Sequence, residues 1–302
     1  MSIVSAACEG VTRACKDVSV QRIVTAELDL DLAGTADLIF SLTTARQVPL
    51  ASEILTFTRD DLVYTPTEII DQDGTRLHRL TGEPGPLRVR YEAIVEGQTG
   101  PARTSELDSI IYLRPSRYCQ SDEVFSQARH QFAGLAGAEL IAAVTRFVEQ
   151  SVTYTPGLSL GTDSAVTTLM TGQGVCRDYA HVVIALLRAM DVPARYAACY
   201  APGLTPMDFH AVAEAYLDGA WYVIDATRLA DRRSLVRIAT GRDAADCAFL
   251  SFHGAQVGLD RLHVDAWVVP DVAGPANADD PSADPFAQAS VPDDYLELVQ
   301  LG

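Results

Sequence analysis

The chain has 302 residues, of which 48% are hydrophobic and 21% are charged, so it is long enough for two domains with full cores and ordinary in composition for a globular protein. Its net charge of −17 argues against nucleic acid and anionic membranes as partners, because both bind basic surfaces. No segment approaches the roughly 20 apolar residues of a membrane-spanning helix, so we expect no membrane partner.

Residues 1–10 contain no basic residue ahead of an apolar stretch, so we predict no secretory signal and a cytoplasmic location. Six cysteines occur without a Cys-x-x-Cys pair or a nearby histidine cluster, and a zinc site is therefore not expected. Cys8 and Cys15 are close enough in sequence for a disulfide, but reduced thiols fit a cytoplasmic chain better.

The first third of the chain carries the signals of strands. Short β-branched or alternating runs are separated by turn residues, and no stretch sustains a helical period. The predicted strands are 21–30, 36–42, 54–58, 68–70 and 87–95. Asp73 and Gly74 predict a two-residue hairpin turn between Ile70 and Leu77. We predict an antiparallel β-sandwich domain over residues 1–120; the alternative is a sheet extension of one larger domain.

The pattern changes to helical spacing near Ser121, which resembles a helix start, and residues 138–151 place apolar side chains at helical intervals. Ser164 is a candidate cap for a short helix that Gly172 would end. A mostly apolar helix is predicted over 176–190, as expected of a buried central helix. Strands are predicted at 195–200, 211–217 and 221–224. Residues 121–270 are therefore expected to form an α+β catalytic domain.

Residues 271–302 hold seven acidic residues, four prolines and no basic residue. Such a composition cannot bury enough apolar surface to form its own core, so we predict a C-terminal tail that is dispensable for the fold. Only residues 295–299 are apolar enough to dock, against the body of the protein or a neighbouring subunit. A homo-oligomer is therefore left open.

Cys176 lies where the central helix is predicted to begin. The partial positive charge at a helix N-terminus favours the thiolate, which is the nucleophilic form of cysteine. Downstream, His210 and Asp225 stand at the edges of two predicted strands. A thiol, an imidazole and a carboxylate are the parts of a thiol acyl-transfer site.

The register of one hairpin links His210 to Asp225. Asp218 and Gly219 predict a two-residue turn, so Leu217 would pair with Ala220 and His210 would lie opposite residue 227. Asp225 is then a diagonal neighbour of His210 on the same face, within reach of its side chain. A hydrogen bond between them would fix the imidazole tautomer and leave the other nitrogen toward the thiol.

Three sequence runs resemble the bacterial branch of the transglutaminase-like family of papain-type thiol enzymes, namely 113–119 (LRPSRYC), 172–181 (GQGVCRDYAH) and 241–246 (GRDAAD). The resemblance implies a papain-like catalytic domain with Cys176 as nucleophile, His210 as general base and Asp225 as the orienting residue. The family usually carries Trp two residues after the histidine, where this chain has Val212. That difference is expected to alter the substrate cleft rather than remove a catalytic atom.

Four further residues are candidates for the site. The amide of Cys176 is the natural oxyanion donor at a helix N-terminus, and Gln173 would add a side-chain donor unless it is only a turn residue. Arg177 and Asp178 would bind substrate charge or form a local ion pair, and Arg228 would line the cleft or pin the loop after Asp225.

These residues predict an enzyme that cleaves peptide or isopeptide amide bonds in a peptide or protein substrate, without a metal or organic cofactor. A transglutaminase or deamidase uses the same triad, and an acidic surface would suit an alkylammonium acceptor. A non-catalytic binding module on the same fold is the third alternative, although such a module would be expected to lose a triad residue.

Overall fold

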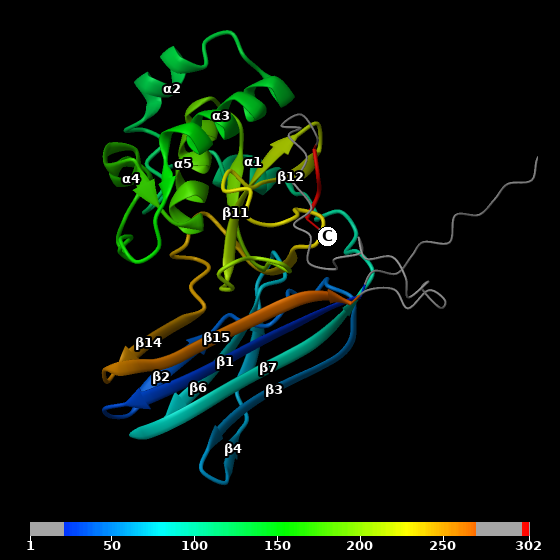
Figure 1. Ribbon diagram of the computed structural model, residues 1–302, viewed down its shortest axis with the longest axis vertical. Helices are drawn as coiled ribbons and strands as arrows, with labels where there is room; N and C mark the ends of the chain where they lie inside the picture. The colour runs from blue at the N-terminus through cyan, green and yellow to red at the C-terminus, as the bar shows by residue number, and fades with distance from the viewer. Residues whose placement is uncertain (1–20, 270–297, 302) are drawn as a thin grey trace, which may run out of the picture.

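The structure is a computed structural model that describes residues 21–269 and 298–301. Its lower half in Figure 1 contains two antiparallel sheets. One sheet has the strand order β15 (Val257–Val269), β1 (Gln21–Leu32), β7 (Gly85–Glu96), β3 (Leu50–Arg59) and β4 (Leu62–Tyr64). The other has the order β14 (Leu250–Gly254), β2 (Ala36–Phe40), β6 (Arg76–Gly82) and β5 (Thr67–Ile70).

The two sheets pack face to face through their alternating apolar side chains. Along β1, every second residue from Arg22 to Leu30 is buried, as expected of a strand with one face on a core. Phe40 of β2 meets Phe57 of β3 with ring centroids 5.1 Å apart. The predicted β-sandwich is confirmed.

The other half of the molecule is built on a four-stranded antiparallel sheet, in the order β12 (Ala220–Ile224), β11 (His210–Leu217), β10 (Ala194–Tyr200) and β13 (Val236–Gly241). Two short parallel strands lie apart from it, β8 (Thr153–Tyr154) and β9 (Gln173–Gly174). The helices are α1 (Glu106–Ile111), α2 (Phe125–Gln131), α3 (Gly137–Ser151), α4 (Ala165–Thr171) and α5 (Cys176–Ala189).

Helix α5 is the centre of this half. It packs on β10 and β11, and α2, α3 and α4 pack around it (Figure 1). Every residue from Asp178 to Ala189 is buried, which explains why the sequence is apolar on all sides. The α+β fold predicted from the sequence is confirmed. None of the helices in the described ranges is long and apolar enough to cross a bilayer.

The predicted α+β domain runs to residue 270, but the last strands within it belong to the β-sandwich. β15 pairs with β1 and β14 pairs with β2, so residues 250–269 complete the sandwich although they follow the α+β half in sequence. β14 and β15 were not predicted, because their partners lie more than 150 residues away in sequence. β13 was not predicted either, because it pairs with β10 through an irregular register that leaves no local signal.

Local turn and cap signals had mixed outcomes. The β5–β6 hairpin exists, but its loop spans residues 71–75 because the Asp71 carboxylate accepts hydrogen bonds from the Asp73 and Thr75 amides. Ser164 caps α4 and Gly172 ends it with φ +65°, as predicted. Ser121 does not start a helix, since α2 begins at Phe125.

Residues 298–301 dock on the α+β half of the molecule. Val299 forms a β-bridge with Val223 on β12, and Leu301 is 3% exposed in a small core with Val212 and Leu235. Docking thus reaches Leu301, beyond the predicted 295–299, and it makes Val299 and Leu301 part of this core. The rest of the tail and the Cys8–Cys15 pair lie outside the described residues.

Replacing Leu301 with Ala should lower the free energy of unfolding by about 2 kcal/mol or more, because it removes buried methyl groups and leaves a cavity. Leu62→Ala is the matched control, since Leu62 is 64% exposed and its loss should cost within about 0.5 kcal/mol. Urea unfolding of the three proteins measures the difference. Equal stability of both variants would mean that the C-terminal end adds nothing to the core.

Candidate active site

The start of α5 is fixed by tight local packing. β8 and β9 pair in parallel just before the helix, and Gly174 leaves no room for a side chain, because a Cβ there would lie 2.7 Å from the Asp178 Cβ. The amide of Val175 donates to Asp178 Oδ2 at 2.9 Å, which caps the first turn. Cys176 is therefore the first residue of a rigid helix, as predicted, and it is only half-buried.

His210 and Asp225 meet across the β11–β12 hairpin. Leu217 pairs with Ala220 around Asp218 and Gly219, both at positive φ, so the predicted register is confirmed. His210 Nε2 lies 2.8 Å from Asp225 Oδ2. Both side chains are almost fully buried, at 0% and 1% exposure.

The carboxylate of Asp225 is held from both sides. Its Oδ1 accepts hydrogen bonds from the amide of Thr227 at 2.9 Å and from the Thr227 hydroxyl at 2.6 Å. Burial alone would raise the pKa of Asp225, but the charge and hydrogen bond of His210, together with Thr227, lower it. Asp225 is thus ionised and can only accept, so His210 Nε2 must carry the proton.

The contact with Asp225 also sets the protonation state of His210. Burial would lower the pKa of His210, but the charge and hydrogen bond of Asp225, with a smaller contribution from the neighbouring Cys176 thiol, raise it to about 10. His210 Nδ1 is buried and has no hydrogen-bond partner among the described residues. The imidazole therefore presents one unengaged nitrogen beside the thiol, an arrangement that can support a thiolate–imidazolium pair.

The other described cysteines are unlike Cys176. Cys119, Cys199 and Cys247 are free and buried, and burial raises the pKa of all three thiols. Within the described residues, no group of three or more His, Cys, Asp or Glu side chains is placed to hold a metal ion.

The four accessory candidates have different surroundings. Asp178 is fully buried in the helix cap, and Arg177 donates to it at 2.8 Å and to the Ser159 hydroxyl at 2.7 Å. These two residues join the 159–160 loop to the helix start, which favours the local ion pair over substrate binding. Arg228 Nε lies 3.2 Å from Glu149 on α3. Gln173 is exposed on β9, and its role as an oxyanion donor stays a prediction.

Tyr154 is a neighbour of the site that sequence reasoning missed. Its strand pairs with β9 so that Tyr154 lies beside Gly174, two residues before Cys176. Burial, followed by the charges of Cys176, Asp208 and Asp225, raises the pKa of Tyr154 to about 12. No local pattern predicts this placement, because a two-residue parallel strand leaves no periodic signal.

The sequence runs 113–119 and 241–246 both contact α5 beyond its first turn. The buried Arg188 donates to the carbonyls of Arg114 at 3.0 Å and Arg242 at 2.7 Å. His181 accepts from the amide of Ala244 at 3.2 Å, and burial lowers its pKa well below the usual value. These residues therefore hold α5 in position rather than act in the site.

Comparison with known proteins identifies the family of the chain. Residues 128–226 match the family model of the transglutaminase-like superfamily. A Cytophaga hutchinsonii protein of known crystal structure, provisionally named a cysteine protease, is 32% identical; the match covers 85% of this chain and 93% of that protein, with a TM-score of 0.77. The chain belongs to the transglutaminase-like superfamily, and the resemblance seen in its sequence is confirmed.

A curated relative supports the same relationship over a shorter length. An uncharacterized protein of Mycobacterium leprae is 28% identical over 116 residues, which are 36% of this chain and 42% of that protein. The chain thus spans less than half the length of that relative.

His210 should contribute less to the free energy of unfolding as the pH rises. The loss should begin near pH 6.5, the approximate pKa of histidine in the unfolded chain, and end near the folded pKa of about 10. A raised folded pKa means that the folded state binds the proton more tightly, so this stabilisation is complete below the lower value. Urea unfolding of wild type and His210→Gln should show a difference in stability that shrinks across this range. A difference that stays constant or grows would contradict the assigned imidazolium.

Proposed function

We propose that the protein is a thiol-dependent acyl-transfer enzyme that hydrolyses peptide or isopeptide amide bonds, with Cys176 as nucleophile. The observation that carries the proposal is the pair formed by His210 Nε2 and Asp225 Oδ2 at 2.8 Å, which leaves His210 Nδ1 without a partner beside a cysteine at a helix start. Membership of the superfamily supports a thiol-dependent enzyme in general, and the name of the Cytophaga relative favours peptide or protein substrates.

In the first half of the reaction, the Cys176 thiolate attacks the amide carbonyl and forms a tetrahedral oxyanion. The Cys176 amide at the helix N-terminus is the expected donor to that oxyanion. The imidazolium of His210 then gives its Nδ1 proton to the leaving amine as the C–N bond breaks, which leaves an acyl thioester on Cys176.

In the second half, His210 Nδ1 takes a proton from water, and the resulting hydroxide attacks the thioester. The C–S bond breaks, the carboxylic acid leaves, and the thiolate–imidazolium pair is restored. Asp225 keeps the proton on Nε2 throughout, so Nδ1 is the nitrogen that exchanges protons with substrate and water. An amine in place of water at this step would give transglutaminase activity.

A library of peptide amides tests the reaction. Wild type should release carboxylic acid and amine or ammonia from a subset of the library, and Cys176→Ala should release none, because it lacks the nucleophile. Parallel reactions with an added alkylamine separate hydrolysis from transfer, since transfer yields a substituted amide. Turnover by Cys176→Ala equal to wild type would contradict the proposal, and amide exchange without hydrolysis would favour a transglutaminase.

Replacing Asp225 with Asn should leave the fold intact and slow acylation by roughly 10³–10⁴-fold, because the amide nitrogen can stabilise the wrong imidazole tautomer. Asp218→Asn is the matched control, since Asp218 lies in the same hairpin at φ +49°, a conformation that Asn tolerates. Rates of thioester formation with an activated ester measure both variants. Near-wild-type acylation by Asp225→Asn would remove Asp225 from the site.

A further inference from the structure

A cavity lies where the sandwich meets the sheet of β10 to β13. It has a volume of about 910 Å³, within the range of small-molecule sites, which occur preferentially at domain interfaces. Its walls come from the β5–β6 loop, the segment 99–105 that links the two halves, the first turns of α1, and the sheet residues Arg195, Arg237 and Thr240. None of the proposed triad lines it.

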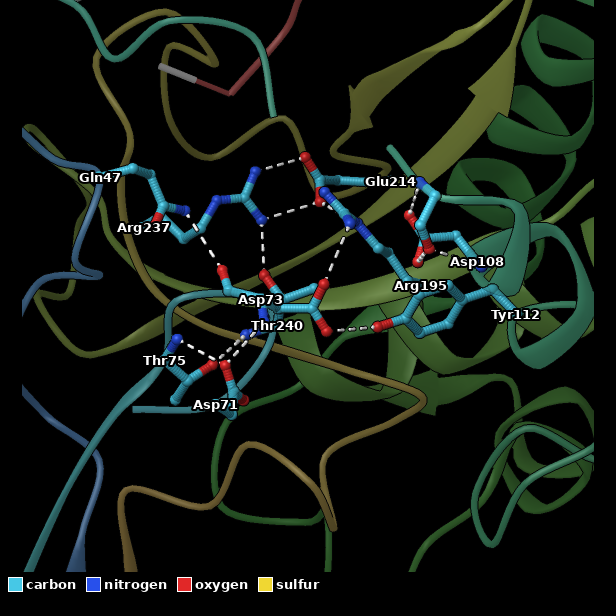
Figure 2. A network of polar contacts seen from close by, with 11 residues as sticks. Gln47, Asp71, Asp73, Thr75, Asp108, Tyr112, Arg195, Glu214, Arg237 and Thr240 are labelled. Atoms are coloured by element: carbon cyan, nitrogen blue, oxygen red, sulfur yellow. Dashed lines mark hydrogen bonds and ion pairs between the residues drawn. The ribbon is translucent and has the colours of Figure 1, made fainter. Parts of the chain in front are cut away.

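The floor of this cavity is a buried ionic cluster (Figure 2). Glu214 of β11 accepts from Arg195 Nε at 2.7 Å and from the two terminal nitrogens of Arg237 at 2.8 and 2.6 Å. The side chains of both arginines are only 3% exposed. Two buried guanidinium groups therefore share one carboxylate, and the fourth charge of the cluster is Asp73 on the β5–β6 loop.

The contact between Arg195 and Asp73 is incomplete. Arg195 Nη1 lies 3.8 Å from Asp73 Oδ1, too far for a hydrogen bond, and Nε is the only nitrogen of Arg195 that donates one to a described residue. Asp73 Oδ2 accepts from the Tyr112 hydroxyl at 3.0 Å, whereas Oδ1 accepts no hydrogen bond from the described residues. A guanidinium edge and a carboxylate oxygen thus stand side by side at the cavity wall.

The neighbouring acidic residues do not complete this contact. Asp108 accepts from the amide and the hydroxyl of Ser105, and Asp71 Oδ1 accepts from the amides of its own loop. Trp221 covers one face of the Arg195 guanidinium, with the ring centroid 4.0 Å from Cζ, and the Tyr112 ring centroid lies 5.9 Å from the same atom. Burial, partly offset by Tyr112 and Arg195, raises the pKa of Asp73, as expected of a carboxylate with too few partners.

The charge of the cluster selects the ligand. Arg195 and Arg237 balance Glu214 and Asp73, and the other charged lining residues also balance, Arg46 and Arg103 against Asp71 and Asp108. A bound anion or cation would therefore add an uncompensated charge to the site. A zwitterion adds none. In an α-amino acid the amino nitrogen and a carboxylate oxygen are about 2.7 Å apart, close enough to span the two groups. Its carboxylate would accept from Arg195 and its ammonium would donate to Asp73.

We propose that this cavity binds a free α-amino acid with an apolar side chain. The remaining volume lies beside Ile70 and Leu107, which are 39% and 48% exposed on the wall. Apolar side chains of the ligand would bury this surface, and glycine would leave it in water.

The site is connected to the proposed triad through one strand. Glu214 and His210 both lie on β11. Because side chains alternate along a strand, residues 210, 212 and 214 share one face. Arg195 lies on the neighbouring β10 and donates to Glu214, so a ligand that engages Arg195 contacts a residue bonded to the strand that carries His210. The inference does not rest on the thiol chemistry, because it concerns binding alone.

Isothermal titration calorimetry of full-length Cys176→Ala with L-leucine tests the site independently of turnover. Leucine should bind saturably, while N-acetyl-leucine and leucinamide, which each lack one charge, should bind at least about tenfold more weakly, as expected for one lost charge-assisted hydrogen bond. Glycine should also bind more weakly. Equal binding of leucine and N-acetyl-leucine, or no saturable binding of leucine below about 50 mM, would overturn the proposal.

Two variants test whether leucine binds in this cavity. Asp73→Asn should weaken leucine at least about tenfold and leave N-acetyl-leucine unchanged, because that analogue has no ammonium for Asp73 to bind. Leu107→Asn, on the exposed wall, should weaken leucine but not glycine. Asp260→Asn on the exposed part of β15 is the matched control and should change nothing. Leucine binding that survives both cavity substitutions would overturn the assignment.

Discussion

The hydrogen bond between His210 Nε2 and Asp225 Oδ2 is the contact on which the proposed chemistry depends. It exists because a two-residue turn at Asp218 and Gly219 sets the register of β11 against β12. A slip of one residue would turn one of the two side chains to the opposite face. The ion pair is also buried, which strengthens its electrostatics and makes either partner costly to leave alone.

The thiol is positioned by a separate element, the buried helix α5, which is held in place at both ends. Its first turn is fixed by Asp178 and the close approach of Gly174, and its last turn by the hydrogen bonds of Arg188. Rigid elements hold a nucleophile and a base at a constant separation better than loops do. The family motifs outside the proposed triad contribute mainly through this positioning.

The sequence predicts those features whose cause is local. The hairpin at Asp218, the cap at Ser164 and the start of α5 at Cys176 each follow from a few adjacent residues, and all are present. Features that depend on distant partners could not be predicted: β14 and β15 return to the sandwich, and Tyr154 reaches the site by pairing with β9. The five-residue loop at 71–75 was mispredicted because the Asp71 side chain outweighed the Asp-Gly signal.

The rate of Cys176 alkylation by iodoacetamide, followed against pH with the modified site mapped by mass spectrometry, tests the central claim most directly. Because Asp225 raises the pKa of His210 to about 10 and the other described cysteines are buried, the account predicts modification of Cys176 well ahead of Cys119, Cys199 and Cys247. It also predicts that this modification is strongly slowed in His210→Gln at neutral pH. A rate that follows an ordinary thiol, with a midpoint near pH 8.5 in both proteins, would contradict it.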